Sequence, residues 1–185
     1  MGLKITGGIY KGRELKILNL KAVRYTSSKV RESVFNMVGD VTGFEILELF
    51  AGSGIFSLEA ISRGAKLVSL VEKNDRMIDL IKKNVELLGV SDRCRIMKFD
   101  VKKAIPFLYE RKNKYDIIFL DPPYDKGYVN GTLMMLKRYP LHREGGIIII
   151  EHSKREKPEW SCYGELLTRK YGDTCVTLIW MKGAN

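Results

Sequence analysis

The sequence of 185 residues predicts an α/β protein of three layers, in which helices cover both faces of a mostly parallel β-sheet. Two observations favour this class. Apolar runs and amphipathic stretches alternate from residue 44 onward, as repeated strand–helix units require. Two of the apolar runs, 116–120 and 146–151, are uninterrupted, which is typical of strands that are covered on both faces.

The first residues precede this alternation. Two strand-like runs within residues 3–18 are separated by a pair of glycines, which predicts a β-hairpin. A helix follows, capped by Ser27 or Ser28, with three valines on its apolar face: Val30, Val34 and Val38. We therefore divide the chain into an N-terminal arm, residues 1–26, and a main domain, residues 27–185.

The main domain contains the remaining elements. The expected strands are 44–50, 67–72, 95–99, 116–120 and 146–151. The expected helices between and after them are 55–63, 75–88, 101–109 and 127–137. The last two runs, 164–170 and 174–181, flank a Tyr-Gly-Asp turn signal, so we expect the sheet to finish with an antiparallel strand.

Composition limits the class of protein. Apolar residues make up 45% and charged residues 29%, which suits a globular domain with a buried core. No stretch approaches the roughly 18 apolar residues of a membrane span, and no apolar secretory signal opens the chain. The cysteines are too far apart for a disulfide framework or a CxxC pair: Cys94, Cys162 and Cys175. We expect a monomer without metal in the reducing cytoplasm.

Positive charge is concentrated at the start of the chain. The whole chain has a net charge of +10, and residues 1–31 contribute eight lysines and arginines against a single glutamate. Such a basic arm favours a polyanionic partner, most simply nucleic acid. We expect Lys4, Lys11 and Arg13 to contact RNA phosphates beside the active site. Solubility is the alternative explanation of the excess charge.

A glycine-containing loop follows the first strand of the main domain. Ligands of open α/β sheets bind beyond the carboxyl ends of strands, where strand order reverses. Glu72 ends the next strand, where its carboxylate can accept hydrogen bonds from two ribose hydroxyls. Position 57 is serine, so the dinucleotide fingerprint lacks its third glycine, and no P-loop lysine follows. A ligand with ribose but without pyrophosphate fits better, and S-adenosylmethionine is the common one.

A third strand end supports a nucleoside ligand. Asp100 can accept a hydrogen bond from an adenine amine while apolar neighbours clamp the ring. An ordinary tight turn would explain the glycines alone, and Phe50 could equally belong to the core. The predicted cofactor contacts from these loops are Phe50, Ala51, Gly52, Ser53, Gly54, Glu72, Lys73, Asp100 and Val101.

The fourth strand ends in the tetrapeptide 121–124, Asp-Pro-Pro-Tyr. The prolines remove two N–H donors, so the Asp121 side chain and the Pro122 carbonyl present acceptors without a competing donor. Such a pair suits an exocyclic amine of a nucleobase, because it can grip the amine hydrogens and expose the nitrogen lone pair. Tyr124 offers a face on which an extruded base stacks, and Pro123 lies beside it. We predict Asp121, Pro122 and Tyr124 as catalytic residues; a turn capped by Asp121 is the alternative.

Four motifs occur in a familiar order: LELFAGSG (47–54), VEKN (71–74), FD (99–100) and DPPY (121–124). This order resembles the class I, Rossmann-like amino-methyltransferases. The stretches ITGG (5–8), KGR (11–13), VRESVFN (30–36) and GSGIFSLEAISRGA (52–65) resemble the RsmD-type family of 16S ribosomal RNA guanine-N2 methyltransferases.

The resemblance implies a seven-strand sheet, S-adenosylmethionine as methyl donor, and 16S RNA in an assembling small ribosomal subunit as substrate. It also implies that four residues approach the cofactor or shape its pocket: Thr26, Arg31, Glu32 and Asn36. The chain departs from the family pattern twice, with Tyr25 in place of proline and Glu48 in place of aspartate. Glu48 could contact the methionine amine of the cofactor or pair with Arg31, and both interpretations stay open.

We therefore expect residues 27–185 to form an S-adenosylmethionine-dependent methyltransferase domain acting on a guanine N2 amine. An adenine-N6 methyltransferase is the alternative enzyme, since the 121–124 motif suits that amine too. A non-catalytic RNA-binding scaffold is the alternative of another class, although it would not require an intact glycine loop or Asp121.

Overall fold

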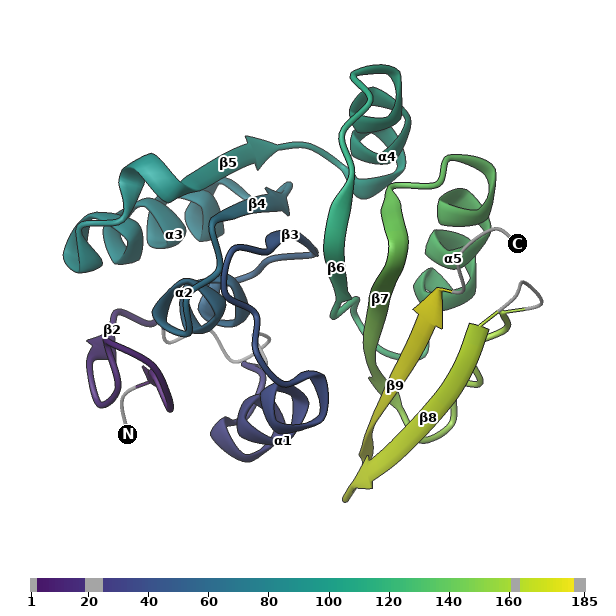
Figure 1. The fold of residues 1–185 in the computed structure, drawn as a ribbon, viewed down its shortest axis with the longest axis horizontal. Coiled ribbons are helices and arrows are strands. Elements are labelled where there is room, and N and C mark those ends of the chain that lie inside the picture. The colour runs from purple at the N-terminus through teal and green to yellow at the C-terminus, as the bar shows by residue number, and fades with distance from the viewer. Residues whose placement is uncertain (1–2, 19–24, 161–163, 182–185) are drawn as a thin grey trace.

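The sheet at the centre of the molecule has seven strands in the order β5-β4-β3-β6-β7-β9-β8 (Figure 1). The structure is a computed structural model and describes residues 3–18, 25–160 and 164–181. The first five strands in this order are parallel, whereas β9 is antiparallel to both of its neighbours. The strands are β3 (Glu45–Leu49), β4 (Leu67–Glu72), β5 (Cys94–Lys98), β6 (Tyr115–Leu120), β7 (His142–Ser153), β8 (Gly164–Tyr171) and β9 (Thr174–Met181).

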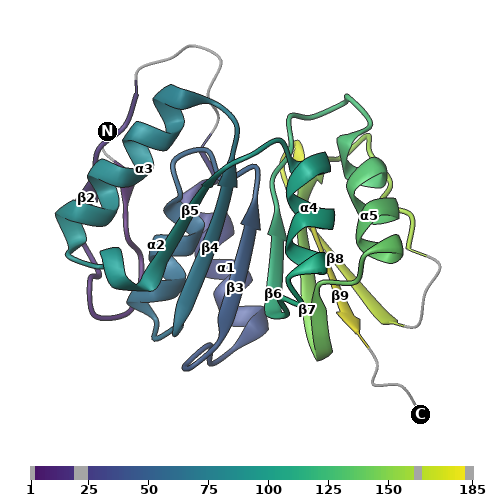
Figure 2. The same cartoon turned by 90° about the horizontal axis from the view of Figure 1, so that it is seen from above.

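Helices cover both faces of this sheet (Figure 2). One face carries α1 (Ser28–Val38), α2 (Ile55–Ser62) and α3 (Asp75–Leu88), and the other carries α4 (Val101–Glu110) and α5 (Tyr128–Arg138). Each face has its own buried apolar cluster. Phe119 of β6 belongs to the first cluster, and its neighbours Ile118 and Leu120 belong to the second. The prediction of a three-layer α/β/α protein is confirmed.

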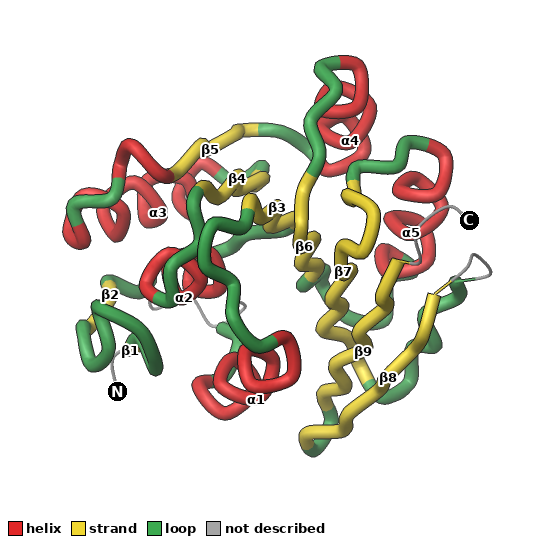
Figure 3. Tube along the Cα trace, in the orientation of Figure 1, coloured by secondary structure: helices red, strands yellow, loops and turns green. Residues whose placement is uncertain are grey.

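Most predicted elements lie within one or two residues of their expected bounds, and β4 and α3 coincide with them. The exception is β7, which begins at His142 rather than at residue 146. Its first residue pairs with Tyr115 before a register shift, so the apolar run alone did not mark its start. The predicted terminal hairpin is confirmed: β8 and β9 form a long antiparallel pair beside β7 (Figure 3). A short 3-10 turn, Ser91–Arg93, precedes β5.

The N-terminal hairpin is present but minimal. Its strands β1 (Leu3–Lys4) and β2 (Glu14–Leu15) have two residues each and pair antiparallel. The hairpin tip packs on the end of α2: the Ile9 N–H donates to the Ser62 carbonyl at 2.8 Å. A Cβ on Gly8 would lie 1.9 Å from that carbonyl oxygen, so this close approach requires glycine. Residues 1–2 and 19–24 of the predicted arm, and Cys162, lie outside the described residues.

Strand order reverses between β3 and β6. The chain passes from β3 to β4 and β5 on one side, then returns to place β6 on the other side of β3. The loops that leave the carboxyl ends of these two strands therefore separate, and a ligand can enter between them. The fold brings the glycine loop after β3 and the tetrapeptide 121–124 after β6 to this point. None of the helices in the described part of the chain is long and apolar enough to cross a membrane.

Candidate cofactor and amine site

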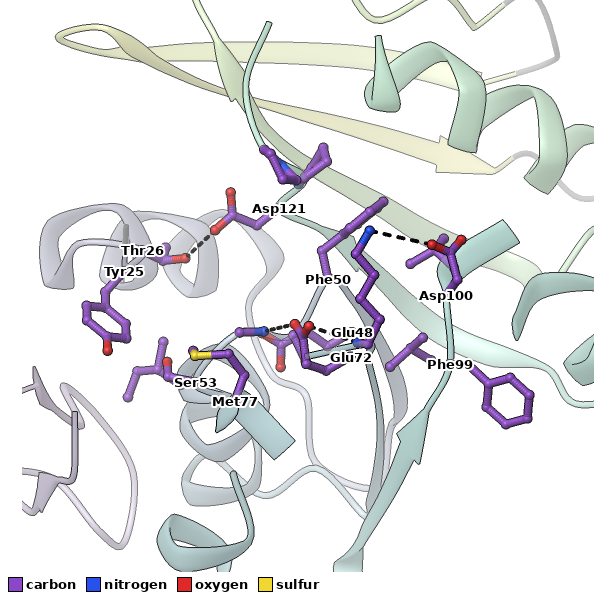
Figure 4. A pocket seen from close by; sticks show the side chains of 18 of the residues that line it. Tyr25, Thr26, Glu48, Phe50, Ser53, Glu72, Met77, Phe99, Asp100 and Asp121 are labelled. Carbon is purple, nitrogen blue, oxygen red and sulfur yellow. Dashed lines mark hydrogen bonds and ion pairs between the residues drawn. The ribbon is translucent and has the colours of Figure 1, made fainter. Parts of the chain in front are cut away.

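A cavity of about 380 Å³ lies beyond the carboxyl ends of β3, β4, β5 and β6 (Figure 4). It brings together most of the predicted site residues, from four strand ends and from the segment before α1. The predicted residues that line it are Thr26, Glu48, Phe50, Ala51, Gly52, Ser53, Glu72, Lys73, Asp100, Val101, Asp121, Pro122, Pro123 and Tyr124.

The carboxylate of Glu72 is fixed by three backbone N–H groups. Gly52 donates to Glu72 Oε2 at 2.9 Å, and Lys73 and Asn74 donate to Oε1 at 2.8 Å each. The glycine loop therefore orients this carboxylate as well as admitting a ligand. Gly54 does not line the cavity. It begins α2 in a left-handed conformation, and a Cβ there would lie 2.8 Å from Leu70 Cδ2, so its role is close packing.

Glu48 is a buried carboxyl in the cavity wall, with 3% of its surface exposed. Its Oε2 accepts a hydrogen bond of 3.0 Å from the Ser57 N–H in the first turn of α2. Burial raises the pKa of Glu48 to about 8, although the hydrogen bonds from Ser57 oppose the shift. Arg31 Nε lies 3.5 Å from Glu59 Oε2, so Arg31 pairs with Glu59, and it acts on Glu48 as a nearby positive charge that opposes the rise in pKa.

Asp100 lies at the end of β5 and accepts a hydrogen bond of 3.0 Å from the Lys102 N–H, which caps α4. Lys73 Nζ lies 3.6 Å from Asp100 Oδ2, and both residues line the cavity. Phe50 adopts a left-handed conformation with a φ of 62°, which is uncommon for a residue other than glycine. Phe50 lines the cavity, and its ring centroid lies 5.8 Å from that of Tyr128; its contact with the cofactor stays a prediction.

The amine side of the cavity is assembled from distant segments. Thr26 Oγ1 donates to Asp121 Oδ2 at 3.3 Å, and Figure 4 shows the two side chains facing each other. The Tyr124 hydroxyl donates to Glu151 Oε1 at 3.1 Å and lies 3.2 Å from Thr174 Oγ1. The hydroxyl is thus tied to the end of β7 and the start of β9, which fixes the ring that we predicted to stack on a base.

Three further residues that we predicted near the cofactor do not line the cavity: Arg31, Glu32 and Asn36. Arg31 is fully buried, and its guanidinium donates to the Thr26 carbonyl at 2.5 Å. Glu32 and Asn36 are exposed on α1. One side of α1 packs on the sheet, so residues at other positions of the same helix point elsewhere. Arg31 can affect the cavity through Thr26, whereas nothing in the geometry connects Asn36 with it.

The predicted phosphate contacts lie in the hairpin rather than in the cavity wall. The cavity opens at the N-terminal end of α2, whereas the hairpin tip packs on Ser62 at the C-terminal end. Lys11 and Arg13 belong to this tip region and are exposed, and Lys4 pairs with Glu14 at 3.0 Å. The expectation that the hairpin lies beside the mouth of the site is wrong, because its glycine pair docks onto the far end of α2.

Six lining residues were not predicted: Tyr25, Ile55, Val71, Met77, Phe99 and Lys126. Val71 and Phe99 stand inside the motifs VEKN and FD, so the motifs themselves contained the signal. Tyr25 replaces the family's proline. Its hydroxyl exchanges two hydrogen bonds of 3.0 Å with the backbone of Leu18, and Ser27 still caps α1. Met77 on α3 had no sequence signal, because its apolar spacing is that of a core residue.

Comparison with known proteins identifies the family. The family model of Conserved hypothetical protein 95 matches residues 3–180. Ribosomal RNA small subunit methyltransferase D of Buchnera aphidicola is 31% identical over 90% of this chain and 88% of its own length.

Solved structures agree on the fold. Escherichia coli yhhF superposes with a TM-score of 0.85 over all of both chains at 24% identity. The 16S rRNA N2 methyltransferase RsmC of Thermus thermophilus, solved with AdoMet and guanosine, has a TM-score of 0.71 at 21% identity. That match covers 89% of this chain and 45% of RsmC. The chain belongs to the RsmD-type family, Conserved hypothetical protein 95, and has the fold of a class I methyltransferase.

Proposed function

We propose that this protein transfers a methyl group from S-adenosylmethionine to the exocyclic N2 amine of a guanine in 16S ribosomal RNA. The observation that supports this most strongly is the meeting of two kinds of group in one cavity. Glu48 and Glu72 line one side, where they suit the cationic and ribose parts of the cofactor, and Asp121 and Pro122 line the other, where they suit an amine. The relatives' names support the reaction class, and the lining of the cavity supports the roles assigned to these residues.

The cofactor side fits S-adenosylmethionine. A buried carboxyl with a raised pKa gains most from a cationic ligand, so Glu48 suits the methionine ammonium. Glu72 is already oriented by three N–H groups, so its carboxylate can accept ribose hydroxyl hydrogens without further rearrangement. Val101 and Phe99 supply an apolar wall for a purine ring. When bound, the cofactor would supply a methyl group on a positively charged sulfur, which would leave as a neutral thioether as the nucleophile takes the methyl group.

Asp121 and Pro122 act on the nucleophile. The lone pair of a guanine amine is delocalised into the ring, which makes the nitrogen a weak nucleophile. A carboxylate and a carbonyl that accept its two hydrogens favour a pyramidal nitrogen and direct the lone pair into the cavity. As the amine forms its new bond to carbon it loses one hydrogen as a proton, and Asp121 is placed to accept it. Tyr124, anchored through its hydroxyl, keeps the base in place by stacking.

RNA binding must involve cations near the mouth of this cavity. Lys73 and Lys126 are exposed lysines that line it, and they follow β4 and β6 along the chain. We therefore assign the phosphate contacts to Lys126 rather than to Lys11 and Arg13. Lys73 also lines the cavity, but its ammonium pairs with Asp100. The hairpin, residues 3–15, acts chiefly as a support for the domain of residues 27–185.

Methyl transfer to isolated small ribosomal subunits tests this proposal. Subunits from a strain that lacks the corresponding enzyme are incubated with the protein and tritiated S-adenosylmethionine, and the 16S RNA is digested to nucleosides. We expect label in N2-methylguanosine, and an initial rate of labelling lowered by about a hundredfold or more with Asp121→Ala. Label in N6-methyladenosine would establish the alternative enzyme, and absence of label from subunits and free 16S RNA alike would refute the function.

A further inference from the structure

Arg31 is an arginine on the packed side of a helix whose other buried residues are apolar. Its side chain is completely buried, yet it connects three separate segments. Nη1 donates to the Thr26 carbonyl at 2.5 Å, Nη2 donates to the Lys4 carbonyl, and Nε lies 3.5 Å from Glu59 Oε2. A buried charge with this many directed partners holds those partners in one arrangement, because each lost contact would leave a charged group unsatisfied.

Glu59 anchors the other end of this network. It is fully buried in α2, and it accepts hydrogen bonds from the Thr6 N–H at 2.8 Å, the Thr6 hydroxyl at 2.7 Å and Arg63 Nε at 3.0 Å. The hairpin is therefore joined to α1 and to α2 by charge-assisted hydrogen bonds, and α1 and α2 are joined by the Arg31–Glu59 ion pair. Apolar packing alone would not define the relative positions of these segments so closely.

Thr26 stands at the end of this network that faces the cavity. Arg31 holds its backbone carbonyl, and only 4% of the residue is exposed, so its side chain has little freedom to turn. Its hydroxyl donates to Asp121 Oδ2 at 3.3 Å. This hydrogen bond is one of the contacts that restrain rotation of the Asp121 carboxylate about its last bond, a torsion that is broad in aspartate side chains.

We infer that Thr26 is a positioning residue that sets the orientation of the Asp121 carboxylate, and that Arg31 holds Thr26 in place for this purpose. The inference rests on the proposed role of Asp121 as acceptor of the amine hydrogens. This inference gives the N-terminal hairpin a structural role in the active site, which its positive charge did not predict. The backbone of Lys4, rather than the Lys4 ammonium, contributes to the active site through Arg31.

The family resemblance implied that Thr26 approaches the cofactor or shapes its pocket, and a direct contact with the cofactor would be a different role from the one inferred here. The two roles differ in what a substitution changes. A cofactor ligand contributes to affinity for S-adenosylmethionine, whereas a positioning residue for Asp121 contributes to the rate once cofactor and RNA are bound. Misplacement of a reacting group by about 1 Å can lower a rate by about a hundredfold, so the expected effect is measurable.

Thr26→Val and Thr26→Ser form the matched pair for this test. Valine keeps the shape and removes the hydroxyl, and serine keeps the hydroxyl. With 16S RNA in small subunits, we expect Thr26→Val to lower kcat by about tenfold to a hundredfold, with KM for RNA and calorimetric affinity for S-adenosylmethionine within about twofold of wild type. Thr26→Ser should recover most of kcat. Unchanged kcat in Thr26→Val would overturn the inference, and so would a loss confined to cofactor affinity, since that would make Thr26 a cofactor ligand.

Arg31→Lys tests the second half of the inference, because lysine keeps the charge but cannot donate to two carbonyls in a fixed fork. We expect its kcat loss to be non-additive with that of Thr26→Val, so that the double variant is little slower than Thr26→Val alone. Fully multiplicative losses would show that Arg31 does not act through Thr26. Retained cofactor affinity in each variant establishes that it is folded.

Crystal structures of wild type and Thr26→Val separate this inference from the proposed function. If wild type does not methylate 16S RNA, the function is wrong, but Thr26 still orients Asp121 if the Asp121 side chain changes rotamer in the variant. An unchanged, equally ordered Asp121 rotamer would refute the positioning role whatever the substrate is.

Discussion

The two sides of the cavity are built in different ways. The cofactor side is local: Glu72 is held by backbone N–H groups of its own loop and of the neighbouring glycine loop, all at the ends of adjacent parallel strands. The amine side is non-local: Asp121 meets Thr26 from 95 positions earlier in the chain, and Tyr124 is held by the ends of β7 and β9. Substitutions in distant segments should therefore lower the turnover rate and leave the affinity for the cofactor nearly unchanged.

The largest expected effect is on stability, at the buried network that supports the amine side. Glu59→Gln removes the charge that faces both Arg31 and Arg63, so we expect a loss of about 3–5 kcal/mol in the free energy of unfolding. The matched control is Glu14→Gln, which breaks the exposed pair with Lys4 and should cost at most ~1 kcal/mol. Urea denaturation measures both values, and equal losses would contradict the importance of the network.

The next effect concerns the cofactor side. Each charge-assisted hydrogen bond contributes roughly 1.5–3 kcal/mol before losses, so Glu72→Ala should weaken S-adenosylmethionine binding by an order of magnitude or more. Glu86→Ala, a substitution of an exposed glutamate on α3, is the control. Calorimetry gives both affinities. Unchanged affinity in Glu72→Ala would place the ribose elsewhere in the cavity.

A third prediction uses the pKa of Glu48, which burial raises to about 8. Below pH 8 the Glu48 carboxyl of the empty site is mostly protonated, so a cationic ligand must displace its proton. The affinity for S-adenosylmethionine should therefore rise with pH between 6 and 7.5, by up to about tenfold per pH unit. It should level off near pH 8, where the α-amino group of the ligand, with a pKa of about 7.7–8.0, loses its own charge.

The same group has the opposite effect on the empty protein. A pKa raised above the unfolded value contributes stability below pH 4.5 that is lost as the pH rises towards 8. Glu48→Gln should remove both the slope of cofactor affinity and this contribution to stability. A pH-independent affinity in wild type would show that Glu48 does not face the ammonium.

The smallest expected effect distinguishes the two candidate RNA-binding surfaces, the mouth of the cavity and the hairpin. The slope of log affinity against log salt changes by about 0.7 for each phosphate contact with single-stranded RNA. Lys126→Ala should make this slope shallower by about that amount, and Lys11→Ala should leave it unchanged. The reverse result would restore the hairpin as the RNA-binding surface.

The contrast between the two sides also explains what could be predicted from the sequence. Glu72 and Asp100 follow their strands directly, and the carboxyl ends of parallel strands meet at one edge, so motif order sufficed to bring them together. The position of the hairpin could not be predicted in this way, because it depends on Gly8 fitting against Ser62 and on buried contacts with Arg31 and Glu59, not on the net charge of the arm. The contact between Thr26 and Asp121 could not be predicted either, because it depends on the buried Arg31. The spacing of apolar residues in a helix does not show that a charged residue among them is buried.

The most direct test of this account is a paired measurement on Asp121→Ala: calorimetric affinity for S-adenosylmethionine and the single-turnover rate of methyl transfer to 16S RNA. We expect affinity within about twofold of wild type and a rate lowered by about a hundredfold or more, because the variant keeps the cofactor side and loses the amine acceptor. Asp121→Asn, which keeps an accepting carbonyl, should retain part of the rate. A wild-type rate in Asp121→Ala would contradict the assignment of the amine side.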